Sequence, residues 1–126
     1  MLVAPGRRSL RIANAGHIPP LLISRDTARF VQEHGQLLGL GTARYRATDI
    51  ELTAPTRLVL CTDGLVEVRR TELRMNLATF EAAARTGPED LEALCDQLID
   101  LFGKDKDDDI ALLAADLTPG AALRAQ

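Results

Sequence analysis

Residues 57–62 read RLVLCT, and this short run constrains the fold more than any other part of the sequence. It contains a continuous run of aliphatic and β-branched residues and is bounded by Pro55 and Gly64. Runs of this kind between turn-forming residues are typical of a β-strand that is covered on both faces. We therefore expect residues 57–62 to form the central strand of a sheet.

Other segments also have the length and pattern of strands. In residues 9–13 (SLRIA), Leu10 and Ile12 alternate with polar or small residues, which is the period of two of a half-buried strand. Pro19 and Pro20 exclude a helix at that point, so the chain is expected to continue in an extended form. The expected strands are residues 9–13, 21–24, 28–32, 45–53 (at an edge), 57–62 and 110–117.

After Gly64 the sequence becomes typical of helices. Residues 72–85 are rich in Leu, Met and Ala and predict one or two short helices. Another helix is expected to begin at Pro88, which suits the first helical position, and to end at Gly103. It carries one apolar stripe, typical of a helix that packs on a sheet: Leu91, Leu94, Cys95, Leu98 and Phe102.

This order of strands, helices and a last strand favours an α+β domain, with helices packed on antiparallel sheet. The length of 126 residues fits one domain or part of a larger one. We assign residues 1–119 to the domain and residues 120–126 to a flexible tail. Residues 35–41 (GQLLGLG) predict a loop whose leucines enter the core.

Composition excludes several classes of partner. A net charge of −3 and a pI near 5.3 imply no broad basic face, so nucleic acid is not an expected partner. No hydrophobic signal region and no apolar run of about 18 residues is present, so no membrane association is expected. Cys61 and Cys95 lie in apolar segments, which is typical of reduced core cysteines and predicts a cytoplasmic protein.

Acidic residues stand at the ends of two expected strands. Asp63 directly follows the central strand and precedes Gly64, while Asp107, Asp108 and Asp109 precede the last strand. A carboxylate at a strand end is well placed to be a metal ligand or a general base. Carboxylate oxygens are also the donors that Mg²⁺ and Mn²⁺ prefer.

Each acidic group also has a simpler interpretation. An Asp before a Gly is most often only a turn, and an acidic run before a strand is usually a solvated loop. From the residues alone, neither signal is specific for chemistry.

Several motifs together are more informative than either acidic group. In order along the chain they are NAGH (14–17), PPLL (19–22), GQLLGL (35–40), LCTDGLVE (60–67) and DDI (108–110). Their order and spacing resemble the C-terminal half of the PPM-type, metal-dependent Ser/Thr protein phosphatases. This is the protein phosphatase 2C superfamily, and the motifs are most similar to its bacterial stage II sporulation protein E branch.

The resemblance implies an antiparallel β-sandwich flanked by helices, with a two-metal Mn²⁺ or Mg²⁺ site at one end. It assigns metal binding and catalysis to Asp63 and Asp108, and it places Gly64 and Asp109 beside them in the metal site. It implies hydrolysis of phosphoserine or phosphothreonine by a metal-activated water, without a covalent phosphoenzyme. The cysteines are accordingly not expected to be nucleophiles.

The resemblance further implies that the fold is truncated on its N-terminal side, because the family carries another metal-binding Gly-Asp motif before the NAGH segment. Two carboxylates are too few for two divalent ions. The chain by itself is therefore expected to bind metal weakly and to hydrolyse phosphate poorly or not at all. The implied substrate is a phosphorylated regulatory protein of the anti-sigma-factor antagonist type.

A non-catalytic function is the alternative. A phosphatase-like fragment with open sheet edges would bind regulatory proteins or associate with itself to cover them. Two further residues stay open at this stage. His17 is part of the NAGH signature, but Asn14 and Gly16 also predict a simple turn there. Glu67 would reach either the acidic site or a neighbouring loop.

Overall fold

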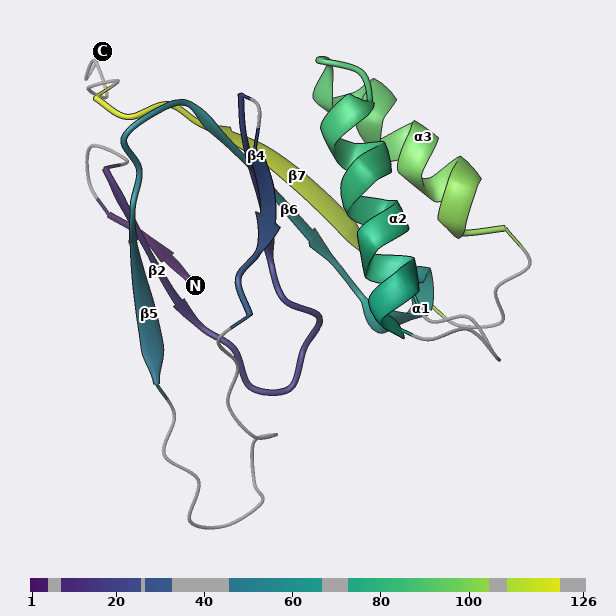
Figure 1. The fold of residues 1–126 in the computed structure, drawn as a ribbon, viewed down its shortest axis with the longest axis horizontal. Coiled ribbons are helices and arrows are strands. Elements are labelled where there is room, and N and C mark those ends of the chain that lie inside the picture. Colours follow the sequence, from purple (N-terminus) through teal and green to yellow (C-terminus); the bar gives the residue numbers. More distant parts are fainter. Residues whose placement is uncertain (5–7, 26, 33–45, 67–72, 105–108, 121–126) are drawn as a thin grey trace, which may run out of the picture.

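Two antiparallel sheets and three helices form the part of the chain that the structure describes (Figure 1). The structure is a computed structural model, and it describes residues 1–4, 8–25, 27–32, 46–66, 73–104 and 109–120. The strands are β1 (Leu2–Val3), β2 (Ser9–Ala13), β3 (Leu21–Ser24), β4 (Thr27–Phe30), β5 (Ala47–Glu51), β6 (Thr56–Cys61) and β7 (Leu112–Leu117). The helices are α1 (Asp63–Val66), α2 (Leu73–Thr86) and α3 (Leu91–Phe102).

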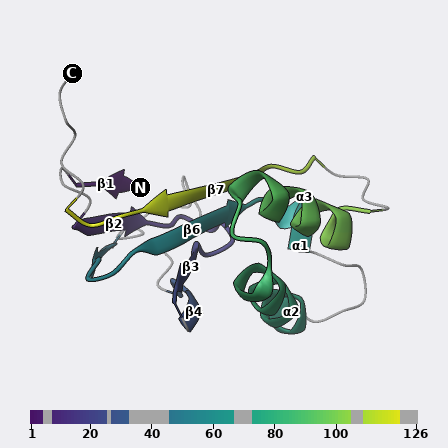
Figure 2. The same ribbon diagram turned by 90° about the horizontal axis from the view of Figure 1, so that it is seen from above.

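The sheets and helices stack in three layers, and the four-stranded sheet is the middle one (Figures 1 and 2). Its strand order is β4-β3-β6-β7, and the three-stranded sheet on one face has the order β1-β2-β5. The helices cover the other face, where α2 packs on β4 and α3 packs on β7. This arrangement confirms the α+β class and the sandwich flanked by helices.

Two apolar cores join these layers. The inter-sheet core lies between the sheets and contains Leu10, Ile12, Leu22, Val31, Ile50, Leu52, Leu58 and Leu117. The helix-side core lies under the helices and contains Leu21, Phe30, Val59, Leu65, Val66, Phe80, Ala84, Leu94 and Leu98.

Strand β6 shows why the central run of the sequence is apolar on both faces. Successive side chains of a strand point to opposite sides, so Leu58 enters the inter-sheet core while Val59 enters the helix-side core. β6 pairs with β3 on one side and β7 on the other. The prediction of a central, doubly covered strand is confirmed, although β6 covers Thr56–Cys61 rather than residues 57–62.

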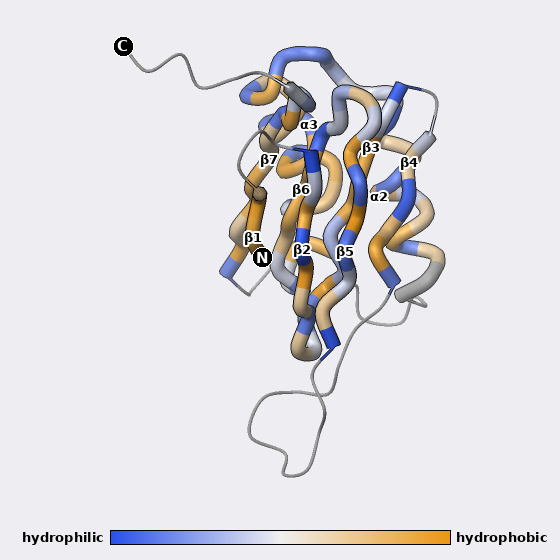
Figure 3. The backbone as a smooth tube through the Cα atoms, turned by 90° about the vertical axis from the view of Figure 1, so that its left-hand side faces the viewer, coloured by the Kyte–Doolittle hydropathy of each residue, from blue (hydrophilic) through white to orange (hydrophobic). Residues whose placement is uncertain are grey.

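Strands β2 and β5 are each buried on one face only. Hydrophobic and hydrophilic residues alternate along both (Figure 3), and only one face of each packs against the middle layer. β5 lies at the edge of its sheet, as predicted, but it is shorter than residues 45–53.

Strand β4 begins earlier than predicted. Ser24 of β3 pairs directly with Thr27 of β4, and the Thr27 hydroxyl donates to the Ser24 carbonyl oxygen at 3.1 Å. The hairpin connection is therefore so short that the strand starts at Thr27 rather than at residue 28. It ends at Phe30, after which the Val31 N–H donates to the Pro20 carbonyl oxygen.

The start of α3 also corrects the prediction. The helix begins at Leu91 instead of Pro88, because Asp90 is the N-cap and its carboxylate accepts from the Ala93 N–H at 2.9 Å. The predicted end at Gly103 is confirmed, where the N–H donates to the Ile99 carbonyl oxygen. Where one or two short helices were expected in residues 72–85, the structure has the single helix α2, which covers Leu73–Thr86.

The remaining differences are smaller. The two-residue strand β1 and the four-residue helix α1 were not predicted, and β7 starts at Leu112 instead of residue 110. The predicted loop 35–41 and most of the predicted tail lie outside the described residues. No helix among the described residues is long and apolar enough to cross a membrane.

Candidate functional site

Asp63 lies where the central strand meets the first helix. One residue separates it from the end of β6, and it is itself the first residue of α1. Gly64, Leu65 and Val66 are buried, whereas Asp63 is exposed. Its Oδ1 accepts a hydrogen bond from the Gly64 N–H at 3.0 Å, which fixes the carboxylate at the surface end of a buried strand.

Gly64 differs from the turn residue that an Asp-Gly pair ordinarily indicates. It is helical and buried in α1, and its φ is not among the positive values found in the described residues. Its contribution to the site is therefore the backbone N–H that orients the Asp63 carboxylate.

Thr62 ties the end of β6 to the segment that precedes β7. Its N–H donates to the Ala111 carbonyl oxygen at 3.0 Å, and its hydroxyl accepts from the Ala111 N–H at 3.0 Å. The same hydroxyl lies 3.4 Å from the Asp109 carbonyl oxygen, to which it donates. The backbone next to Asp63 and the backbone of Asp109 are thus brought together, although the two residues are far apart in the sequence.

The acidic residues described here match Mg²⁺ and Mn²⁺ in kind, since both are hard cations that prefer carboxylate oxygens. Asp109 is exposed beside the Thr62 tie. Asp108, Asp107 and Glu67 lie outside the described residues. Within the described ranges, no group of three or more His, Cys, Asp and Glu residues is arranged to hold a metal ion, so the sharing of a cation by Asp63 and Asp108 stays a prediction.

The NAGH segment forms the turn that its residues predict. The Asn14 side chain is buried, accepts from the His17 N–H at 2.9 Å and donates to the His17 carbonyl oxygen at 3.0 Å. Gly16 has a φ of 86°, a value that glycine adopts without strain. Asn14 therefore stabilises this turn, while the His17 side chain is exposed.

The two cysteines are unpaired and half-buried. Burial, together with the negative charge of Asp63, raises the pKa of the Cys61 thiol to about 11. Burial also raises the pKa of Cys95, with a smaller contribution from Asp96. A thiol is nucleophilic as the thiolate, so a raised pKa opposes a nucleophilic role for either residue near neutral pH.

Two residues of structural importance were missed in the sequence. Thr62 appears there only as part of the TDG motif, and no local pattern indicates its bonds to Ala111 and Asp109. Arg57 appears only as the first residue of the apolar run, although a charged residue in such a run must find partners when it is largely buried.

We expect Thr62→Val to loosen the candidate site. Valine keeps the shape but leaves the Ala111 N–H without its partner, which costs about 1 kcal/mol at a solvent-accessible position. Urea unfolding measures this change, and Mn²⁺ titration should show weaker binding. The control is Thr79→Val on α2, which removes a hydroxyl bonded to the Met75 carbonyl oxygen. Thr79 is distant in the sequence from the acidic residues of the candidate site. An equal loss of Mn²⁺ affinity in both variants would contradict this role of Thr62.

Comparisons with known proteins agree with this architecture. The family model for stage II sporulation protein E (SpoIIE) matches residues 1–118. The RsbU and RsbW domains of Rv1364c from Mycobacterium tuberculosis are similar at 30% identity and a TM-score of 0.73, over 89% of this chain and 34% of that chain. This chain therefore spans about a third of the length of that solved structure. No curated protein matches the chain.

Two other solved structures share the fold. RsbX, solved in complex with magnesium, has a TM-score of 0.66 at 15% identity, over 88% of this chain and 50% of that chain. The PP2C phosphatase domain of SpoIIE from Bacillus subtilis has a TM-score of 0.58 at 18% identity, over 84% of this chain and 34% of that chain. The chain thus belongs to the stage II sporulation protein E family, and its fold is that of PP2C-type phosphatase domains.

Proposed function

We propose that this chain forms the C-terminal portion of a metal-dependent protein serine/threonine phosphatase. Asp63 and Asp108 are the catalytic metal ligands, and Gly64 and Asp109 complete their surroundings in the metal site. The observation that carries the proposal is the bonding of Thr62 to Ala111 and Asp109. It joins the backbone beside Asp63 to Asp109, the last residue of the acidic segment 107–109.

The cation is Mn²⁺ or Mg²⁺ in this proposal. Carboxylate oxygens are the protein ligands that these hard ions prefer, and one relative of the same fold was solved with magnesium. A bound divalent cation supplies a water molecule with a lowered pKa and stabilises negative charge on the phosphoryl group. The chain's own contribution is to hold Asp63 in one orientation through the Gly64 N–H.

The substrate in this proposal is a phosphoserine or phosphothreonine on a regulatory protein of the anti-sigma-factor antagonist type. Membership of the stage II sporulation protein E family supports this class. Asp63 is exposed, so a phosphorylated side chain of another protein can reach it. We also propose a cytoplasmic location, which the unpaired state of Cys61 and Cys95 supports.

A second candidate function is non-catalytic binding or self-association. It is favoured by exposed apolar side chains on two edge strands, Leu2 of β1 and Leu113 of β7, which are 63% and 51% exposed. Edge strands with apolar residues are surfaces on which other chains pair. In this function the chain would associate with a regulatory protein or a second copy of itself.

Hydrolysis of a phosphoserine peptide distinguishes these functions. We expect slow release of phosphate that requires Mn²⁺ and stops when a chelator removes the metal, because hydrolysis depends on the metal-activated water. Circular dichroism with and without chelator serves as the control that the fold persists. Well-folded protein that releases no phosphate at saturating Mn²⁺ would favour the binding function instead.

A further inference from the structure

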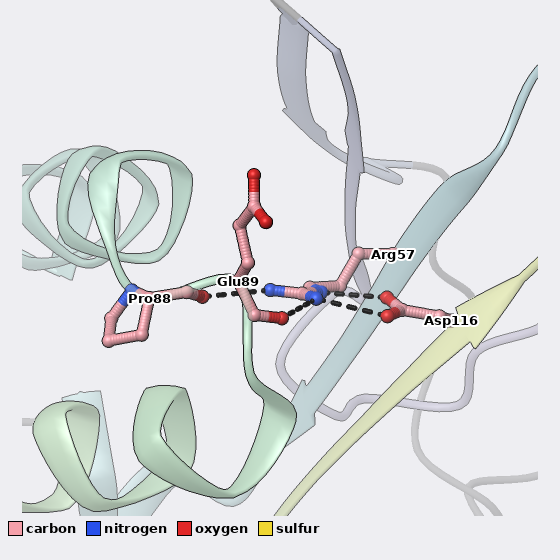
Figure 4. Close-up of polar contacts among 4 residues, drawn as sticks. All are labelled: Arg57, Pro88, Glu89 and Asp116. Atoms are coloured by element: carbon pink, nitrogen blue, oxygen red, sulfur yellow. Dashed lines mark hydrogen bonds and ion pairs between the residues drawn. The ribbon is translucent and has the colours of Figure 1, made fainter.

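Arg57 has the most extensive set of side-chain hydrogen bonds among the interactions described here (Figure 4). Its Nε and Nη2 donate to the two carboxylate oxygens of Asp116 at 2.7 and 3.0 Å. Its Nη1 donates to the Pro88 carbonyl oxygen at 3.1 Å, and Nη2 also donates to the Glu89 carbonyl oxygen. One guanidinium group therefore connects β6, β7 and the segment that leads into α3.

A second arginine–aspartate pair in the chain shows by comparison how the contacts of Arg57 differ. Arg11 and Asp49 are cross-strand partners on β2 and β5, as Arg57 and Asp116 are on β6 and β7. Both pairs are bidentate. The Arg11 side chain is 61% exposed, however, whereas Arg57 is 17% exposed and also binds the two backbone carbonyls. Arg57 thus does more than pair two strands.

Helix α3 runs from the Arg57 contacts toward the candidate site. It begins at Leu91, two residues after Glu89, packs along β7 and ends at Phe102, with Gly103 as its C-cap (Figures 1 and 2). A Cβ atom on Gly103 would lie 3.1 Å from the Cδ1 of Ile110, so the end of α3 closely approaches the residue between Asp109 and Ala111.

The dimensions of helix and strand agree with this course. The 12 residues of α3 span about 18 Å at 1.5 Å per residue. The five steps from Arg57 to Thr62 span about 17 Å at 3.3 Å per residue. The two elements are therefore matched in length, with Arg57 at one end and the Thr62 tie at the other.

We propose that Arg57 is a positioning residue for the candidate metal site. By fixing the start of α3 to β6 and β7, it sets where the end of α3 places Ile110 and hence the bonds between Thr62 and residues 109–111. This inference deepens the proposed function, on which it rests for the identity of the site. The coupling itself concerns only contacts within this chain, so it is testable without activity.

The experiment measures amide hydrogen exchange of the full 126-residue chain by NMR. Arg57→Met removes the guanidinium and keeps an apolar stem of similar length. We expect it to speed exchange of the Thr62 and Ala111 amides about tenfold, because bonds to a charged group are among the stronger ones and local opening follows their loss. Arg57→Lys, which keeps the charge but lacks the planar fork, should fall between Met and wild type.

Two further variants make the result specific. Arg11→Met breaks the matched pair on β2 and β5, and it should leave exchange at Thr62 and Ala111 within about twofold of wild type. Asp90→Ala removes the N-cap of α3 and leaves the hydrogen-bond partners of Arg57 unchanged, and it should speed exchange of the same two amides. Faster exchange in Arg57→Met that is confined to residues 86–92, or that is equal across all strands, would overturn the proposal.

Mn²⁺ titration of the same variants separates this inference from the proposed function. If Arg57 positions the metal site, Arg57→Met should bind Mn²⁺ several-fold more weakly than wild type, while Arg11→Met should bind it equally well. Wild-type chain that binds no Mn²⁺ would count against the proposed function, whereas the exchange data would still decide the coupling through α3.

Discussion

Asp63→Asn is expected to weaken Mn²⁺ binding about 100-fold and to reduce Mn²⁺-dependent hydrolysis to background. Loss of a residue that merely supports a ligand already costs 10- to 100-fold in metal affinity, and a direct ligand should cost at least the upper value. Asparagine keeps the size of the side chain and an oxygen that can accept from the Gly64 N–H. The fold should therefore persist while the negative charge is lost. Calorimetric Mn²⁺ titration and phosphate release measure the two effects.

The matched control for this variant is Asp100→Asn. Asp100 is an exposed acid on α3 and is not part of the candidate site. Asp100→Asn changes the net charge by the same amount as Asp63→Asn, so a general electrostatic effect would appear in both variants. Equal Mn²⁺ affinity of Asp63→Asn and Asp100→Asn would show that Asp63 is not a ligand.

Phe80→Ala should lower the free energy of unfolding by about 3–5 kcal/mol, which is the usual cost of truncating a buried phenylalanine. Phe80 is 1% exposed in the helix-side core, and its ring centroid lies 5.3 Å from that of Phe102 on α3. The substitution removes both the buried area and this aromatic contact between α2 and α3. Urea unfolding, with an unchanged m-value, measures the loss.

Met75→Ala on the same helix is the control for Phe80→Ala. Met75 is 63% exposed, so its truncation leaves no cavity and should change the free energy of unfolding by about 0.5 kcal/mol at most. A cost below about 1 kcal/mol for Phe80→Ala would mean that α2 is not anchored to the sheet and α3 through this side chain.

Local patterns in the sequence predicted much of the fold. The continuous apolar run became β6, because both of its faces are covered, and the alternating run 9–13 became β2 with unchanged bounds. These patterns report directly on burial, which is the main determinant of where a strand lies.

Features that depend on contacts across the chain were not predictable in the same way. Pro88 suits the first turn of a helix, yet Asp90 is the residue that caps α3. Its carboxylate accepts a hydrogen bond from the Ala93 N–H. The carbonyl oxygens of Pro88 and Glu89 are then available to Arg57, which lies more than 30 residues earlier in the sequence. Nothing in the local composition of either segment indicates this pairing.

The same distinction between local patterns and contacts across the chain applies to the candidate site. The acidic residues at two strand ends were visible in the sequence, and the motif resemblance implied that they bind metal. The means by which their segments meet was not visible, because it consists of the bonds of Thr62 to Asp109 and Ala111. Pairing of β6 with β7 fixes which strand ends are neighbours, and this is a property of topology rather than of local pattern.

The central claim is that Asp63 and Asp108 bind one divalent cation together. Mn²⁺ broadens the NMR signals of nearby amides, so titration of the chain with Mn²⁺ tests this claim most directly. We predict that the Gly64 and Asp109 signals broaden together, and that Asp63→Asn and Asp108→Asn each abolish the broadening of both. Broadening of Asp109 that leaves Gly64 unaffected, or that persists in Asp63→Asn, would contradict the claim and would mean that the acidic segment binds cations by itself.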